Sequence, residues 1–214
     1  TQGTSPFIAT LASFGAGLLT GFLTGILYTK GKIPVLLAGI LVMTGIYSIN
    51  LRVLGKATVG LLNQNTLLNT GMLRELPNSF PSVTLGLILL TLLILLLALF
   101  LNTDLGQAFI ATGDNKLMAR SLGINTDNME ILGLMISNGL IGLCGGLIAQ
   151  NDGYADVNMG VGTIVIGLAA IIIGEVAFGE LSLTARLVAV ILGSIFYRFV
   201  LLIVLKLGFS TNDF

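Results

Sequence analysis

Long apolar runs separated by short polar stretches are the main pattern in this chain. A helix that crosses a bilayer needs about 20 mostly apolar residues, and six runs meet or approach this length. The pattern therefore predicts an all-α, polytopic bundle of membrane-spanning helices that forms one domain over residues 1–214. The predicted spans are residues 6–28, 33–51, 83–101, 131–150, 157–174 and 187–207.

Glycines separate packed spans from lipid-facing ones. In the first span Gly17, Gly21 and Gly25 recur every four residues, which places small residues on one helix face and lets another helix approach closely. Residues 131–150 carry five glycines, so we expect this span to pack inside the bundle. Residues 83–101 are rich in leucine and contain one glycine, and we expect them to face lipid.

The second span, residues 33–51, is too polar for a helix that faces lipid. It carries Thr44, Ser48 and Asn50, which predicts that it faces protein or a water-filled cavity, and that it is broken near Gly45.

The last two spans are less regular. Residues 157–174 are rich in glycine and either cross the membrane or turn back within it. Residues 187–207 are interrupted by Arg198. Either they form a full span in which Arg198 faces inward, since a charge within a span is expensive and usually functional, or the span has other ends.

The polar stretch 104–130 lies between two apolar runs and contains a predicted short helix. Asp114 is expected to cap a helix over residues 115–122, and Gly123 to end it in the left-handed conformation. Such an amphipathic helix either docks into a groove of another protein or lies on the membrane surface as a connector, and the residues alone leave both open. Its apolar side chains are Leu117, Met118 and Leu122, and Lys116 and Arg120 share the other side.

Composition agrees with a membrane protein and excludes several function classes. Hydrophobic residues make up 55% of the chain and charged residues 9%, with a mean hydropathy of +1.00, whereas soluble domains carry about 25% charged residues. The net charge is zero and no basic run occurs, which argues against nucleic acid binding. The chain has no histidine and one cysteine, so an internal disulfide, a Cys/His metal site and histidine-based catalysis are excluded. We expect no metal or cofactor.

Several motifs resemble a known family. They are Thr103–Gly106, Ala111–Asn115, Ala119–Asn125, Gly145–Gly146 and Val165–Glu175. Together they resemble the cytoplasmic coupling segment and later spans of bacterial ABC importer permeases, in the subgroup of the branched-chain amino acid and ribose permeases. The sequence departs from the family pattern at Phe109, Ile110 and Glu175. The departure at Glu175 resembles the sequences of a branch of this family that is found beside lipoprotein-type binding proteins.

The resemblance implies a multi-pass permease subunit in the bacterial inner membrane. Such a subunit pairs with a second permease copy, takes solute from an extracytoplasmic binding lipoprotein and is driven by a separate cytoplasmic ATPase. The chain lacks the Gly-x4-Gly-Lys-Ser/Thr phosphate loop, so it is expected to have no ATPase site or other enzymatic activity of its own. The implied ATPase-coupling residues are Gly106, Ala111, Gly113, Asp114, Asn115, Ala119, Leu122, Gly123 and Ile124.

Polar residues of the spans are candidates for the translocation path. They are Thr44, Ser48, Asn50, Ser137, Asn138, Thr163 and Arg198. For each uncharged residue the competing interpretation is a hydrogen bond between helices. For Arg198 it is a position at the membrane interface, or an ion pair with a glutamate such as Glu175.

The solute is expected to be an amino acid, aromatic or branched-chain. A sugar or nucleoside permease is the alternative within this family, and an ion-coupled secondary transporter is the alternative from another class. The chain begins Thr-Gln-Gly and ends abruptly, which together with the resemblance predicts that at least one span precedes Thr1 and one follows Phe214.

Overall fold

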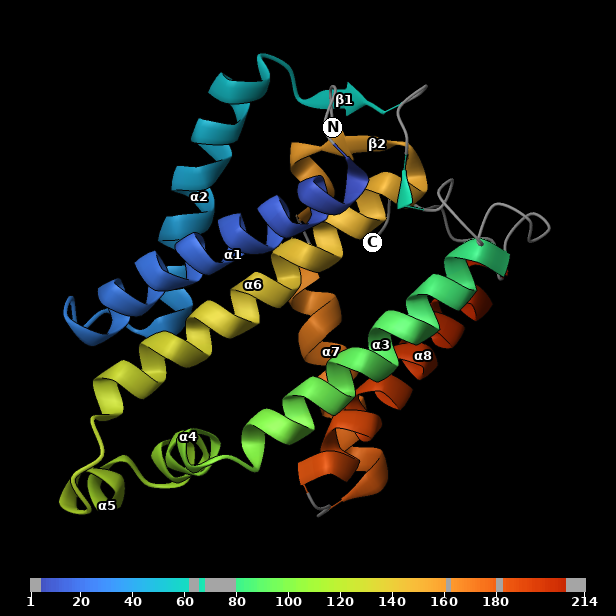
Figure 1. Ribbon diagram of the computed structural model, residues 1–214. Helices are drawn as coiled ribbons and strands as arrows, with labels where there is room; N and C mark the ends of the chain where they lie inside the picture. The colour runs from blue at the N-terminus through green and yellow to red at the C-terminus, as the bar shows by residue number, and fades with distance from the viewer. Residues whose placement is uncertain (1–4, 62–65, 68–79, 161–162, 180–182, 207–214) are drawn as a thin grey trace. The chain divides into compact units, whose positions relative to one another are not determined.

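The computed structural model describes residues 5–61, 66–67, 80–160, 163–179 and 183–206, and within them the chain is almost entirely helical (Figure 1). Its contacts divide it into two compact units, Thr1–Leu93 with Leu99–Val157, and Ile94–Ala98 with Asn158–Phe214. The elements in chain order are α1 (Pro6–Thr29), α2 (Val35–Leu54), β1 (Thr58–Gly60), α3 (Phe80–Leu101), α4 (Asp104–Asp114), α5 (Lys116–Ser121), α6 (Thr126–Asp152), β2 (Tyr154–Asp156), the 3-10 helix η3 (Val157–Gly160), α7 (Thr163–Phe178) and α8 (Leu183–Lys206).

Buried and exposed residues are distributed as in a membrane protein. Within the described residues, six helical segments are long and apolar enough to cross a bilayer. The buried apolar side chains of this part are all alanines, namely Ala38, Ala119, Ala170 and Ala189, while large leucine, isoleucine and phenylalanine side chains are exposed. Large exposed apolar side chains are unfavourable in water but favourable in lipid. In lipid, contacts between helices are made by small residues. The predicted fold, a polytopic helical membrane bundle, is confirmed.

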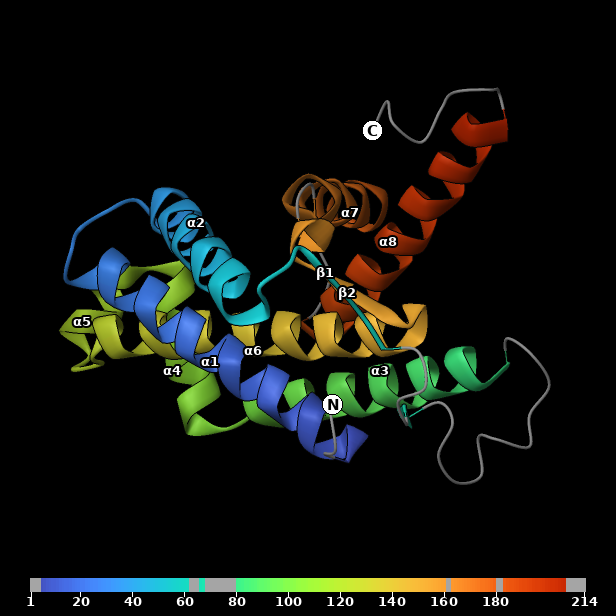
Figure 2. The ribbon, with the colours of Figure 1, turned by 90° about the horizontal axis from the view of Figure 1, so that it is seen from above.

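Helices α1 and α6 form the most extensively packed pair of the first unit and lie next to each other (Figure 1), and seen from above α1 crosses α6 at an angle (Figure 2). A Cβ added to Gly17 would lie 2.9 Å from the carbonyl carbon of Asn138, and one added to Gly21 would lie 2.8 Å from that of Leu134. Real Cβ atoms do not approach backbone this closely, so only glycine permits the contact. The glycine spacing of the first span therefore predicted its packing face correctly.

The course of α2 differs from the prediction. The helix continues through Gly45 to Leu54 and ends at Gly55, whose φ of 67° is left-handed. The predicted break at Gly45 is wrong because a glycine lacks a side chain but keeps its N–H, so the helical hydrogen bonds can continue without interruption.

A short strand pair was not predicted. β1 and β2 pair antiparallel, with Thr58 opposite Asp156 and Gly60 opposite Tyr154, and the Thr58 hydroxyl donates to the Asp156 carboxylate. β1 follows α2 and β2 follows α6, so the pairing joins the C-terminal ends of these helices. Between β1 and α3, residues 62–65 and 68–79 lie outside the described part of the chain.

The second unit consists mainly of α7 and α8, which pack against each other. A Cβ added to Gly174 of α7 would lie 3.0 Å from the carbonyl carbon of Ala189, and one added to Gly193 of α8 would lie 2.8 Å from the Gly174 nitrogen. α7 has 16 residues, about 24 Å at 1.5 Å per residue, and η3 precedes it. Small residues again set the distance between two helices.

Candidate coupling segment

The polar stretch 104–130 folds into more helix than predicted. It contains α4, α5 and the first turn of α6 rather than one short helix. The Thr103 hydroxyl caps α4 by accepting from the Gly106 N–H at 3.2 Å. α4 was missed because Gly106, Thr112 and Gly113 lower its intrinsic helix propensity, whereas in the fold Gly106 and Thr112 are buried.

The cap of α5 differs from the predicted one by one residue. Asp114 was expected to cap this helix, but it is the last residue of α4. Asn115, with an extended φ of −152°, is the cap, and its side-chain oxygen accepts from the Met118 N–H at 3.0 Å. Gly123 adopts the left-handed conformation at φ 84°, as predicted. One cap residue thus separates two consecutive helices.

Large apolar side chains are exposed on one side of α5 and at its C-cap, Leu122. Leu117 is 80% exposed, Met118 52% and Leu122 66%, and we call these three residues the docking surface. Ala119, which the resemblance placed among the coupling residues, is fully buried against its own chain. A surface of this kind on a polar segment is suited to a groove of another protein.

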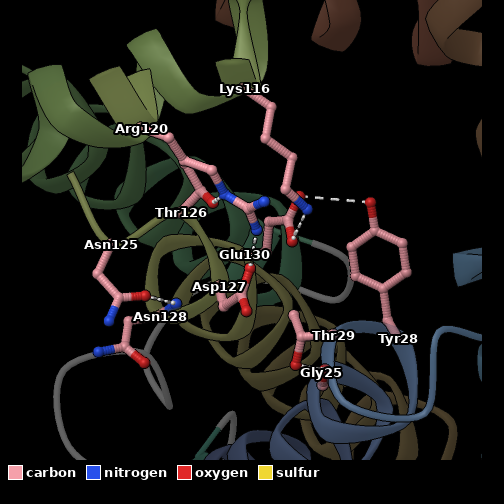
Figure 3. Close-up of polar contacts among 10 residues, drawn as sticks. All are labelled: Gly25, Tyr28, Thr29, Lys116, Arg120, Asn125, Thr126, Asp127, Asn128 and Glu130. Atoms are coloured by element: carbon pink, nitrogen blue, oxygen red, sulfur yellow. Dashed lines mark hydrogen bonds and ion pairs between the residues drawn. The ribbon is translucent and has the colours of Figure 1, made fainter. Parts of the chain in front are cut away.

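Side chains on the opposite side of α5 fasten it to α6 (Figure 3). The Arg120 Nε donates to the Thr126 hydroxyl at 2.7 Å, and its guanidinium pairs with the Asp127 carboxylate at 2.6 Å. Lys116 pairs with Glu130 at 2.8 Å. The Tyr28 hydroxyl of α1 donates to the same carboxylate at 3.3 Å.

Sequence reasoning did not select four of these residues, namely Tyr28, Thr126, Asp127 and Glu130. The available signal was charge alternation, because the two cations of α5 are followed by two carboxylates shortly after the turn at Gly123. Tyr28 gave no signal, since it lies 102 positions before Glu130.

Several other predicted coupling residues make packing contacts and backbone hydrogen bonds within the segment. Gly106 is buried where α3 turns into α4, and a Cβ there would lie 2.5 Å from the Leu101 Cα. Ala111 accepts the N–H of Asn115 at 3.0 Å, and Ile124 donates its N–H to the Ala119 carbonyl at 3.1 Å. These contacts shape the turns that present the docking surface.

The predicted path residues hydrogen-bond within their own helices. The Thr44 hydroxyl donates to the Leu41 carbonyl at 2.9 Å, and Ser48, at 3.4 Å, to that of Thr44. Ser137 and Asn138 both donate to the Leu134 carbonyl. Within the described residues, these hydrogen bonds stay inside one helix, and a role in the translocation path stays a prediction.

The remaining path residues are placed as follows. Asn50 is exposed on α2, Arg198 is exposed on α8, and the side chain of Thr163 lies outside what the structure describes. Glu175, suggested as a partner of Arg198, instead faces Arg186 at 3.4 Å, with both side chains more than half exposed.

Comparison with known proteins gives consistent results. A family model described as "Branched-chain amino acid transport system / permease component" matches residues 1–212. A tyrosine transport system permease protein of Clostridioides difficile is 44% identical over all of this chain and 70% of its own length.

More distant relatives match over a smaller share. An uncharacterised protein of Rickettsia prowazekii is 32% identical over 70% of the chain and 51% of its own length. An autoinducer 2 import system permease protein of Salmonella paratyphi B is 28% identical over 69% of the chain and 41% of its own length. The chain thus spans about half or less of these two relatives. No solved structure matches it.

Proposed function

Since the chain belongs to the family of permease components of branched-chain amino acid transport systems, we propose that it forms the translocation path of an ABC importer for an aromatic amino acid. It is a multi-pass protein of the bacterial inner membrane. In the proposed complex, two permease copies form the path, a cytoplasmic ATPase supplies energy, and an extracytoplasmic binding lipoprotein delivers solute.

The observation that carries the proposal is the docking surface of α5. Three large apolar side chains, Leu117, Met118 and Leu122, are exposed on a polar segment, while the opposite side of the helix is fastened to α6. A groove in the ATPase would cover the apolar side. Closure of the ATPase dimer around ATP would then displace α5 and shift the permease between inward-open and outward-open states.

The proposed substrate rests on the relative in C. difficile, whose name specifies tyrosine. The alternative substrate, a sugar or nucleoside, has weaker support. A relative whose name specifies a solute other than an amino acid, the autoinducer 2 permease of Salmonella paratyphi B, shares only 28% identity with this chain. Ion-coupled transport is disfavoured because such carriers place proton- or ion-binding carboxylates within the membrane. In the described helices that are long enough to cross, the carboxylates lie near helix ends, at Asp127, Glu130, Asp152 and Glu175.

Exposed polar groups on α2 support a path along this helix. Thr44, Ser48 and Asn50 are exposed, although a helix surrounded by lipid would gain by hiding them. We infer that α2 faces the path, where these groups offer hydrogen bonds to a zwitterionic substrate.

The proposal is tested by pull-down of the ATPase with Leu117→Glu. This residue is highly exposed, so the substitution leaves the fold intact, but a carboxylate buried in an apolar groove should weaken capture at least about tenfold. Asn128→Glu is the matched control, because it adds the same charge at an exposed position at the start of α6 and should leave capture unchanged.

The identity of the substrate is tested with the purified permease reconstituted together with its ATPase and binding protein. ATP-driven uptake of labelled tyrosine should be inhibited by unlabelled phenylalanine and not by leucine or ribose. If the unaltered permease captures no ATPase, the ABC proposal is wrong, and ion-driven uptake is the next assay.

A further inference from the structure

Three helices meet at the carboxylate of Glu130 (Figure 3). On the α5 side, its Oε2 accepts from Lys116 Nζ at 2.8 Å. On the α1 side, its Oε1 accepts from the Tyr28 hydroxyl at 3.3 Å. Lys116 Nζ also lies 5.6 Å from the centroid of the Tyr28 ring, within the range of a cation–π contact. Each of these three side chains therefore contacts the other two.

This junction is better shielded from solvent than the second link between α5 and α6. The Glu130 side chain is 16% exposed and that of Lys116 38%, whereas those of Arg120 and Asp127 are 52% and 47% exposed. Solvent screens exposed ion pairs strongly. A carboxylate that is mostly withdrawn from water depends on its partners, because an unpaired buried charge is expensive.

Behind the junction, α1 and α6 are packed closely against each other. Where Gly25 faces Ile131, one residue beyond Glu130, an added Cβ would lie 3.0 Å from the Ile131 Cα. Closer contacts follow along the pair at Gly21 and Gly17. Because packed backbone cannot deform continuously, a displacement delivered at one end is carried along both helices.

We propose that the Lys116–Glu130–Tyr28 junction transmits movement from the docking helix to the α1–α6 pair, with Glu130 as the positioning residue. This inference rests on the proposed function. The docking surface would make the permease bind its ATPase, and the junction would make ATP hydrolysis move the spans. Binding and transmission would then depend on different residues of one short segment.

The test is the number of substrate molecules transported per ATP hydrolysed, measured with the complete importer in proteoliposomes. Glu130→Gln keeps the shape of the side chain and removes its charge. We expect ATPase capture and hydrolysis to change by less than about twofold, while transport per ATP falls about tenfold, as expected for the loss of a hydrogen bond to a charged group. Tyr28→Phe removes a single oxygen, and a reduction of about threefold is expected.

Rescue separates transmission from simple structural support. The exchanged pair Lys116→Glu with Glu130→Lys restores the attraction between α5 and α6, and the Tyr28 hydroxyl can accept from the new lysine. Transport per ATP should recover to about half of the original value, the remainder being lost with the cation–π contact. Asp152→Asn, an exposed carboxylate at the other end of α6, is the control and should leave the ratio unchanged.

Three outcomes would overturn the inference. They are an unchanged transport ratio in Glu130→Gln, loss of ATPase capture in that variant, and no recovery in the exchanged pair when both chains insert normally. By contrast, failure of the unaltered permease to capture an ATPase contradicts the proposed function itself, so the two failures are distinguishable.

Discussion

At the scale of single residues, the buried amide of Gln150 ties α6 to two distant segments. It donates to the Thr10 hydroxyl of α1 at 2.9 Å and accepts from the Leu67 N–H at 3.1 Å. We predict that Gln150→Leu lowers the free energy of unfolding by about 1–2 kcal/mol, because two polar partners lose their bonds. The thermal unfolding midpoint of the detergent-solubilised protein measures this.

A double-mutant cycle isolates one of these bonds. Thr10→Val removes the hydroxyl that Gln150 binds, and the double variant should be more stable than the sum of the single effects predicts, by about 0.6 kcal/mol or more. An interaction energy indistinguishable from zero would mean that this hydrogen bond contributes nothing to the fold.

At the scale of helices, the close approach of α1 and α6 makes a strong prediction for Gly21. A Cβ there would lie 2.7 Å from the Met135 Cα, so Gly21→Ala must push the two backbones apart, at a cost of about 1–3 kcal/mol. Gly15→Ala is the matched control on the same helix, because its Cβ would meet no atom within 4 Å.

Gly15→Ala should be neutral or stabilising by up to about 1 kcal/mol, since alanine is the better helix former. The measurement is the thermal unfolding midpoint of Gly21→Ala compared with that of Gly15→Ala. Equal stability of the two variants would contradict the packing of α1 on α6.

Local sequence patterns predicted the long helices well. They could not predict contacts between residues that lie far apart in the sequence. Apolar runs located the long helices, and the glycine spacing identified the contact face of α1, because both depend on neighbouring positions. The choice of Asn115 over Asp114 as the cap was missed, because it required knowing that α4 precedes it. The strands β1 and β2 and the contact of Tyr28 with Glu130 were also missed, because their partners lie about 100 positions apart.

The same limit applies to the candidate site. The exposed apolar residues of α5 and its C-cap followed from helical periodicity, so Leu117, Met118 and Leu122 were identified from the sequence. The role of Ala119 was not, because a small residue on a short helix suits either side, and only its burial shows that it faces its own chain.

At the scale of the whole molecule, the membrane-spanning arrangement predicts that the two ends of α6 lie on opposite sides of the bilayer. The helix has 27 residues, about 40 Å at 1.5 Å per residue, which exceeds the hydrocarbon thickness of about 30 Å. With Cys144 replaced by alanine, single cysteines introduced as Ser121→Cys, just before α6, and Asp152→Cys, at its end, test this at two exposed positions.

A membrane-impermeant maleimide should label the Asp152→Cys protein in right-side-out vesicles and the Ser121→Cys protein in inside-out vesicles. The second result places the docking surface in the cytoplasm, where an ATPase can reach it. Labelling of both proteins from the same side would show that α6 does not cross the membrane, and the transmission of movement from α5 through Glu130 would then lose its path to the opposite face.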